Sequence, residues 1–219
     1  MKRALSIGAS GGIGSAVAQE FETRGFDVVR LSRSANGLDV TDATSVARVM
    51  DAVVGDFDAV FVAIGTLAKG GAPEKSLSQI EPEQMQDVFA VNAVGPALIL
   101  AQVERLLPRG RPSFVGVLSA RVGSIGDNRI GGWHSYRASK AALNQIVRGA
   151  AIELARKRKQ AVVVALHPGT VETTFTANYR GHAMVTSAVA ARNLCDVLLG
   201  LSPEDTGQFF DYAGKDVAW

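Results

Sequence analysis

Cysteine is scarce in this chain, which contains only Cys195 among its 219 residues. A lone cysteine excludes an intrachain disulfide and is typical of proteins that work in a reducing compartment. Net charge is scarce too, because 23 basic residues are offset by 21 acidic ones to leave +2. This balance gives no indication of a nucleic-acid partner. The basic cluster at residues 156–159 is interpreted as a solvated helix end, where cations complement the helix dipole.

Long apolar runs are also missing. No segment approaches the roughly eighteen uninterrupted apolar residues that a membrane span requires. The charged start at residues 1–3 imitates an export signal, but the apolar stretch after it soon stops at a glycine-rich loop. We therefore expect a cytoplasmic protein without a membrane contact. The histidines His134, His167 and His182 lack metal-ligand spacing with Cys195, so no metal site is expected.

What the chain does contain is a regular alternation of strand-like and helix-like segments. Apolar runs of strand length occupy residues 4–7, 28–31, 57–64, 114–118, 161–166 and 208–212. Segments with helical spacing occupy residues 15–24, 42–54, 81–107, 135–159 and 186–199. The alternation predicts an α/β fold, a doubly wound parallel sheet of Rossmann type with about seven strands and helices on both faces. We expect residues 1–219 to form a single domain.

The first strand-to-helix loop is rich in glycine, with Gly8, Gly12 and Gly14 spaced G-x-x-x-G-x-G. Glycines there let the backbone turn tightly and approach a pyrophosphate that rests on the N-terminus of the next helix. A plain turn is the alternative, but this place between the first strand and its helix is the context that nucleotide binding requires. The predicted phosphate loop comprises Gly8, Ser10, Gly11, Gly12, Ile13 and Gly14.

The end of the second strand selects between NAD and NADP. An acidic side chain there would bond the ribose 2′-hydroxyl, whereas this chain has Ser32 followed by Arg33. An arginine can hold a 2′-phosphate through charge-assisted hydrogen bonds, each contributing about 1.5–3 kcal/mol. The alternative is a solvated loop arginine. The residues favour NADP(H) as the cofactor.

Tyr136 and Lys140 are the candidate catalytic pair. A spacing of four places both side chains on one helix face, one turn apart. An ammonium beside the phenol favours the phenolate, and lowering the pKa of Tyr136 from about 10 to about 7 needs roughly 4 kcal/mol of differential stabilisation. Such a tyrosine can exchange a proton with a carbonyl oxygen while hydride moves at the carbon. Alone, the pattern Y-x-x-x-K is unspecific.

Three segments together resemble the short-chain dehydrogenase/reductase family. They are the glycine loop, the Y-x-x-x-K helix start, and residues 167–173, which read H-P-G-T-V-E-T. The likeness extends over essentially the whole chain. Residues 136–144 and the ending at residues 205–219 are similar to a small branch of the family, C-factor-like and carbonyl-reductase-like. The resemblance implies a homodimer or homotetramer that acts on a small-molecule carbonyl or alcohol substrate.

The resemblance also implies roles for single residues. Tyr136 would be the acid/base, and Lys140 would also hold the nicotinamide ribose hydroxyls. Asn92 matches an asparagine that holds a water behind the lysine, although by itself it reads as an ordinary helix asparagine. The further implied cofactor contacts are Asp39 and Val40 beside the adenine, Ala63, Ile64 and Gly65 in the next loop, and Pro168, Gly169, Val171 and Thr173 near the nicotinamide.

Two departures from the family pattern bear on the chemistry. Residues 62–65 lack the asparagines of the pattern N-N-A-G. The pattern S-S-x-x-G, counted back from Gly123, places the catalytic serine at Ala120, and Ser119 stands one residue early. Neighbouring strand side chains face opposite ways, so either Ser119 or Ser124 substitutes or the donor is missing. We favour Ser119 as the catalytic serine because the rest of the predicted site is intact.

Two functions follow. The first is an NADP(H)-dependent oxidoreductase that transfers hydride to or from a small carbonyl or alcohol, with Tyr136 as acid/base. The alternative is a low-turnover dinucleotide-binding regulatory or signalling protein. Ala120 favours the alternative, because loss of one oxyanion donor costs roughly 100- to 1000-fold in rate. Residues 174–186, which would cover the substrate, form a short stretch, so we expect an open pocket.

Overall fold

The computed structural model describes residues 1–68, 70–173, 175–176 and 184–219. Within them, six strands form one parallel sheet in the order β2-β1-β3-β4-β5-β6. The strands are β1 (Arg3–Ile7), β2 (Asp27–Leu31), β3 (Ala59–Val62), β4 (Ser113–Leu118), β5 (Ala161–His167) and β6 (Phe209–Asp211). The doubly wound parallel sheet is confirmed. The expected number of about seven strands is corrected to six in these residues, one for each apolar run of strand length.

The helices alternate with the strands as predicted. The α-helices are α1 (Gly12–Thr23), α2 (Arg33–Asn36), α3 (Ala43–Asp51), α4 (Pro82–Phe89), α5 (Gly95–Val103), α6 (His134–Lys157) and α7 (Ser187–Gly200). A π-helix, η2 (Ala90–Val94), joins α4 to α5, and single 3₁₀ turns are η1 (Leu77–Gln79), η3 (Glu104–Leu106), η4 (Arg121–Gly123) and η5 (Pro203–Asp205). Asp42 and Thr186 cap α3 and α7, because each side chain accepts a hydrogen bond from a first-turn amide. The four-residue α2 escaped prediction, since it buries no side chain.

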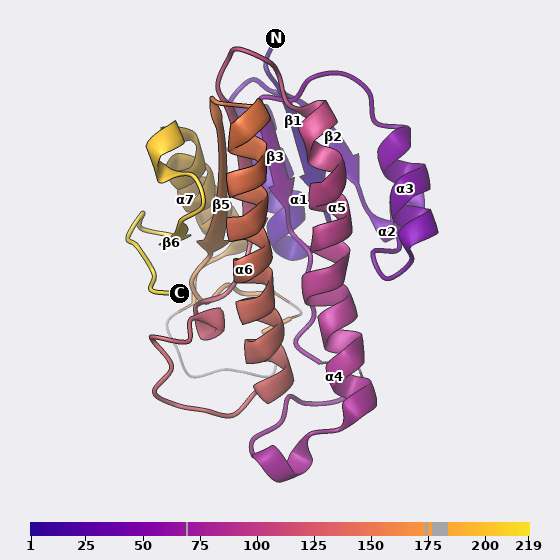
Figure 1. Cartoon of the computed structure of the whole chain (residues 1–219), viewed down its shortest axis with the longest axis vertical. Coiled ribbons are helices and arrows are strands. Elements are labelled where there is room, and N and C mark those ends of the chain that lie inside the picture. The colour runs from indigo at the N-terminus through magenta and orange to yellow at the C-terminus, as the bar shows by residue number, and fades with distance from the viewer. Residues whose placement is uncertain (69, 174, 177–183) are drawn as a thin grey trace.

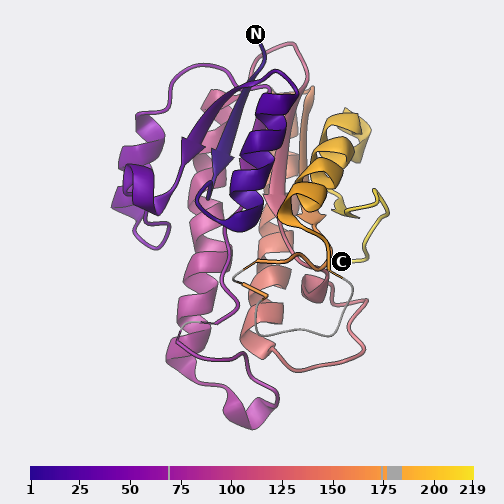
Figure 2. The same ribbon diagram turned by 180° about the vertical axis from the view of Figure 1, so that it is seen from behind.

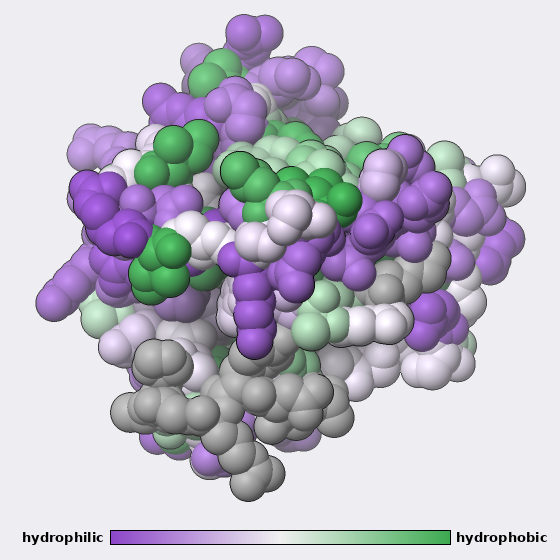
Figure 3. Space-filling model, turned by 90° about the horizontal axis from the view of Figure 1, so that it is seen from below, coloured by the Kyte–Doolittle hydropathy of each residue, from purple (hydrophilic) through white to green (hydrophobic). Residues whose placement is uncertain are grey.

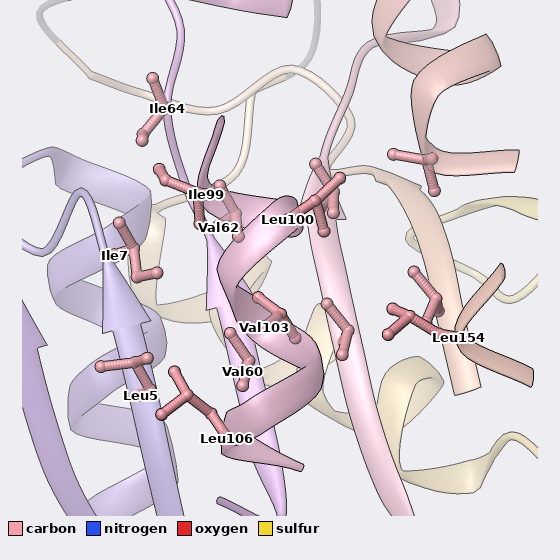
Figure 4. Packing of buried hydrophobic residues seen from close by; sticks show 14 of the residues in the cluster. Leu5, Ile7, Val60, Val62, Ile64, Ile99, Leu100, Val103, Leu106 and Leu154 are labelled. Atoms are coloured by element: carbon pink, nitrogen blue, oxygen red, sulfur yellow. The ribbon is translucent and has the colours of Figure 1, made fainter. Parts of the chain in front are cut away.

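Helices cover both faces of the sheet. Figure 1 shows α5 and α6 in front of the strands, and Figure 2 shows α1 and α7 on the opposite face. Strand side chains alternate between two buried clusters, so Leu5 and Val60 pack on one side and Phe61 on the other. Figure 4 shows the first cluster, where Leu5 and Val60 lie close to Leu106 and Val103. Burying each such side chain contributes about 1.5–3 kcal/mol.

The strand order reverses between β1 and β3. The chain runs from β1 outward to β2, returns to β3 on the other side of β1, and then continues to β6. In open parallel sheets, ligands bind beyond the carboxyl ends of the strands at such a reversal. Figure 3 looks onto the end of the molecule that lies at the bottom of Figure 1, where hydrophobic side chains gather among hydrophilic ones. Most of residues 174–186, the stretch expected to cover the substrate, lies outside the described residues.

Among the residues that the structure describes, one helical segment, Pro82–Leu106, is long and apolar enough to cross a membrane by length and composition. It comprises α4, η2, α5 and η3, and 44% of its most apolar window is buried inside the protein. Ile99 and Val103 from this segment pack in the sheet core. The same length and composition are those of a core helix, and its contacts with the sheet favour that interpretation.

Candidate active site

Two cavities adjoin beyond the carboxyl ends of the strands. The inner cavity, about 280 Å³, is lined by Gly11, Gly12, Ile13, Gly14, Ala63, Ile64, Gly65, Leu118, Ser119, Ala120, Tyr136, Lys140, His167, Pro168, Gly169, Val171, Thr173, Phe175 and Thr176. The outer cavity, about 600 Å³, is lined by Gly8, Ser10, Gly11, Ser32, Arg33, Leu38, Asp39, Val40, Thr41, Ala63, Ile64, Gly65, Thr66, Asp87, Ala90 and Val91. Every site residue predicted from the sequence except Asn92 lies on one of these walls. Their roles remain predictions, but the fold brings them together.

Glycine allows the first loop to pack as closely as it does. Gly8 has φ +87°, and a Cβ built on it would lie 2.3 Å from the carbonyl oxygen of Ala63. A Cβ on Gly14 would lie 2.3 Å from the carbonyl oxygen of Gly8. Helix α1 then starts without a side-chain cap at Gly11 and without an acidic residue in its first turn. Uncapped amides at the positive end of a helix dipole fit the pyrophosphate of a dinucleotide.

The outer cavity carries a positive charge at the end of β2. Ser32 caps α2, because its Oγ accepts a hydrogen bond from the amide of Ala35 at 3.1 Å. Arg33 is therefore the first residue of α2 and lies in the cavity wall. Among the described residues, the Arg33 guanidinium has neither a hydrogen-bond nor a salt-bridge partner. The Asp39 carboxylate accepts hydrogen bonds from the amide and hydroxyl of Thr41, at 2.9 and 2.7 Å. The Arg33 guanidinium can donate to a 2′-phosphate, and the Asp39 carboxylate can accept a hydrogen bond from an adenosine.

Tyr136 and Lys140 lie in the inner wall on the first turns of α6, and both are buried. Lys140 Nζ donates a hydrogen bond to the carbonyl oxygen of Leu118 at 3.0 Å. Burial lowers the pKa of Lys140 to about 7 and raises the pKa of the Tyr136 phenol above its usual range. The expectation of a lowered tyrosine pKa is corrected, because desolvation penalises the charged form of both groups. Both are driven toward their neutral forms.

Aromatic rings flank the Tyr136 phenol. The Trp133 ring meets it edge-on with centroids 6.2 Å apart, and the Phe175 ring lies 5.9 Å away. Trp133 has φ 50°, and it is the one non-glycine residue with positive φ in the described part of the chain. A bulky residue in this left-handed region is strained and is held there by its surroundings. Both rings pack against the phenol in the wall of the inner cavity.

Glu74, which sequence reasoning missed, holds the start of α6. Its side chain is 3% exposed and accepts hydrogen bonds from both the amide and the hydroxyl of Ser135. Its backbone carbonyl accepts one from the amide of Trp133. The hydrogen bonds with Ser135 lower the pKa of the Glu74 carboxyl against the opposing effect of burial. A carboxylate from 61 residues away thus serves as the cap of the helix that carries Tyr136.

Asn92 lies behind this wall on the π-helix and is fully buried. Its side chain accepts a hydrogen bond from the amide of Thr66 at 2.7 Å and donates to the carbonyl of Thr66 and to Ser139 Oγ, at 2.8 and 3.0 Å. Pro96 lacks the N–H that an α-helix would donate to the Asn92 carbonyl, which accounts for the break in the regular ladder. Through these hydrogen bonds, Asn92 connects the loop after β3 to α6 at Ser139, about one helical turn after Tyr136.

Ser119 and Ala120 face different surroundings, as their adjacent positions predict. The Ser119 hydroxyl donates a hydrogen bond of 2.6 Å to Oδ1 of the buried Asn144. Ala120 lines the inner cavity beside Tyr136, and its methyl group has no proton to donate. The sequence prediction that Ser119 donates to the substrate would require this bond to break. Ser124 is buried, and its Oγ accepts a hydrogen bond from the amide of Asp127.

His167 is a second residue that sequence reasoning set aside. It lines the inner cavity at the end of β5, and its Nδ1 is buried without a hydrogen-bond partner in the described residues. Burial lowers the pKa of its imidazole to about 4. The signal available in the sequence was its place directly before Pro168 and Gly169. In the described part of the chain, no three His, Cys, Asp or Glu side chains group so as to hold a metal ion.

Comparisons with known proteins agree with this geometry. The family model described as enoyl-(acyl carrier protein) reductase matches residues 8–210. The 1-hydroxy-2-glutathionyl-2-methyl-3-butene dehydrogenase of Rhodococcus sp. (strain AD45) is 31% identical over 236 aligned residues, which cover 100% of both chains. The C-signal protein of Myxococcus xanthus is 35% identical over 144 residues, covering 66% of this chain and 84% of that protein.

A solved structure resembles the whole fold. A short-chain dehydrogenase/reductase from Burkholderia multivorans, crystallised with bound NADP, has a TM-score of 0.84 and 29% sequence identity. The alignment covers 100% of this chain and 99% of that one. The family model, the full-length relative and the parallel sheet lead to one assignment: this chain is a member of the short-chain dehydrogenase/reductase family of oxidoreductases.

Proposed function

We propose that this protein is an NADP(H)-dependent oxidoreductase that transfers hydride between the cofactor and a small carbonyl or alcohol. The observation that carries the proposal is the continuity of the two cavities. Gly11, Ala63, Ile64 and Gly65 line both, so a ligand with one end at Arg33 can extend to Tyr136. The relative from Burkholderia multivorans, which holds NADP, supports the cofactor assignment.

The chain's own residues divide the work of holding the cofactor. The uncapped amides at the start of α1 would bind the pyrophosphate, and Arg33 would bind the 2′-phosphate. Lys140, whose Nζ lies 3.0 Å from the Leu118 carbonyl oxygen, would hold the nicotinamide ribose hydroxyls. NADPH, when bound, supplies the hydride.

Tyr136 would supply the proton. Burial raises the pKa of its phenol, so the O–H is retained at neutral pH and can be donated to the oxygen of a carbonyl substrate. Lys140 next to it has a pKa of about 7, so it exchanges protons readily near neutrality. A protonated phenol is the form of Tyr136 that reduction of a carbonyl needs.

The walls of the inner cavity indicate the kind of substrate. Leu118 and Phe175, which have no implied cofactor contact, present apolar surface in the same wall as Tyr136. A small carbonyl compound with an apolar or aromatic substituent fits these walls best. The Rhodococcus relative is named as the dehydrogenase of a hydroxyl compound, which is consistent with an alcohol or carbonyl as the reacting group.

A dinucleotide-binding regulatory protein with little turnover is the second candidate. Ala120 favours it, because the residue offers no hydrogen bond to a substrate oxygen. The similarity to the C-signal protein of Myxococcus xanthus is the other observation that favours a regulatory protein. The intact Tyr136 and Lys140 favour the enzyme.

One experiment separates the two candidates. NADPH oxidation is followed across a panel of small aldehydes, ketones and quinones, and NADPH binding is titrated by fluorescence in the same preparation. Carbonyl-dependent oxidation with saturable kinetics supports the enzyme. Tight NADPH binding without oxidation for any carbonyl supports the regulatory protein, and absence of NADPH binding contradicts both.

We further propose that the protein forms a homodimer through α5 and α6. A groove between these helices is lined by small residues, among them Ala97, Ala101, Gly149 and Ala150, which allow close approach of a second copy. Ile152, also on α6, is 48% exposed. The mass in solution by light scattering tests this, and a monomer at micromolar concentration contradicts it.

A further inference from the structure

The proposed reaction lacks a donor at one position. A carbonyl oxygen that takes up charge during hydride transfer is stabilised by hydrogen bonds in addition to that of the proton donor. Ala120 faces the inner cavity but has no proton to give, and the Ser119 hydroxyl is directed at Asn144. A second donor has to come from another wall.

His167 lies beside the end of β4, next to Ala120, where the hydrogen-bond donor is missing. Leu118 on β4 pairs with Leu166 on β5, and the amide of Ser119 donates to the Leu166 carbonyl at 2.8 Å. His167 follows directly and lines the same inner cavity as Ala120 and Tyr136. Its buried Nδ1 makes no hydrogen bond in the described residues. Nδ1 is therefore sealed from the cavity and can serve as the bare nitrogen of a neutral ring. Nε2 makes no hydrogen bond among the described residues and is not buried, so it is the nitrogen that can donate to a ligand in the cavity.

We propose that His167 is a further catalytic residue, a neutral imidazole that donates a hydrogen bond to the substrate oxygen in place of the missing serine. The proposal rests on the oxidoreductase function and specifies how its substrate is held. Tyr136 remains the residue that gives its proton to the substrate oxygen.

The surroundings of His167 keep the imidazole neutral. Its charged neighbours are Arg121 from η4 and Asp211 from β6, which lie 3.9 Å apart and act on the imidazole in opposite senses. Tyr136 and Lys140 from α6 face the same cavity. Burial is the larger influence and lowers the pKa of His167 to about 4. A neutral imidazole carries one N–H and one acceptor nitrogen, so it can donate without losing its proton.

The reaction balances with these roles. NADPH, when bound, would supply the hydride for the new C–H bond and would leave as NADP⁺, while the electron pair of the carbonyl π bond moves to the oxygen. The Tyr136 proton then forms the new O–H bond, which leaves a phenolate that Lys140 can reprotonate. The His167 N–H bond stays intact throughout. The hydrogen bond from this N–H to the substrate oxygen shortens as charge develops on the oxygen.

The test compares three variants with the native protein. His167→Ala removes the donor, and kcat should fall by about 100-fold or more with NADPH affinity unchanged. His167→Gln keeps an N–H and should retain most of the rate. Adding Ala120→Ser to His167→Ala should recover at least about tenfold of the loss, because a serine then fills the gap from the neighbouring strand. Ser113→Ala is the matched control: this hydroxyl is equally buried and unpaired, but it lies at the opposite end of β4.

A readout independent of turnover completes the test. In ¹⁵N-histidine-labelled protein, the His167 resonances are those absent from His167→Gln. They should report a neutral imidazole at pH 7, with an N–H signal that shifts when NADP⁺ and an unreactive carbonyl analogue are added together. The unfolding midpoints of all variants are compared with that of Ser113→Ala, so that lost folding is not mistaken for lost chemistry.

The outcomes separate the two proposals. If native protein oxidises NADPH with carbonyls and His167→Ala does so at nearly the native rate, the His167 proposal fails and the proposed function stands. The His167 proposal also fails if the ring is an imidazolium at pH 7, or if its N–H signal does not shift when the analogue is added. If native protein shows no carbonyl-dependent oxidation, the proposed function fails and the role of His167 fails with it.

Discussion

Replacing Arg33 by Ala should remove the preference for NADP(H) over NAD(H). Arg33 begins α2 in the wall of the outer cavity, and among the described residues its guanidinium has no partner that would compete for it. Ser32, where a ribose-binding acid would stand, already uses its Oγ to cap α2. The guanidinium is therefore free to bind a phosphate. Because position 32 is a serine and not an acidic residue, it does not repel that phosphate.

The magnitude follows from the type of bond. A hydrogen bond to a charged group contributes about 1.5–3 kcal/mol, which corresponds to roughly 10- to 150-fold in affinity. Arg33→Ala should weaken NADPH binding by that factor and leave NADH binding almost unchanged, because NADH has no 2′-phosphate. The preference should also shrink as salt is raised, since an exposed pair is screened by ions.

Fluorescence titration of both cofactors into native and variant protein measures the effect. Arg30→Ala is a suitable control, because Arg30 lies three residues earlier on β2, pairs with Glu22 and is absent from the cavity wall. Equal affinities of the native protein for NADPH and NADH would refute the reasoning. So would an Arg33→Ala variant that weakens both cofactors alike.

Two further predictions concern the inner cavity. Glu74→Ala should lower the free energy of unfolding by about 1–3 kcal/mol, because the Ser135 amide and hydroxyl lose their buried acceptor. The same variant should lower kcat more than it lowers the affinity for NADPH. The control Asp42→Ala removes the cap of α3 at a cost of about 1 kcal/mol and should leave kcat unchanged. If Glu74→Ala keeps full kcat, Glu74 does not position Tyr136. Ser119→Ala should be nearly silent in kcat while it destabilises the protein, because the Ser119 hydroxyl is bonded to Asn144. Ala120→Ser alone should add little to kcat while His167 supplies the donor. A large loss of kcat in Ser119→Ala would restore the serine that the sequence favoured.

Local patterns made much of this molecule predictable. Each buried strand appeared as an apolar run, and Asp42 and Thr186 marked helix starts through the chemistry of capping. Gly8 and Gly14 were recognisable because a loop between the first strand and its helix has few other reasons to carry them. These features depend on residues near one another in the chain, so sequence spacing is enough to find them.

Features that depend on distant contacts were out of reach. Nothing near Glu74 in the sequence indicates that its carboxylate caps a helix 61 residues later. The lowered tyrosine pKa expected from a neighbouring ammonium did not appear, because spacing gives no measure of burial. The direction of the Ser119 hydroxyl likewise depends on Asn144, a partner 25 residues away.

The central claim is that Tyr136 donates the proton in an NADPH-dependent reduction, and Tyr136→Phe tests it most directly. The phenylalanine keeps the ring that packs against Trp133 and Phe175, and it removes only the hydroxyl. Steady-state NADPH oxidation with the best carbonyl of the panel is measured beside NADPH titration for both proteins. The account predicts that the variant binds NADPH as the native protein does and loses almost all of its turnover. Substantial turnover by Tyr136→Phe would contradict it.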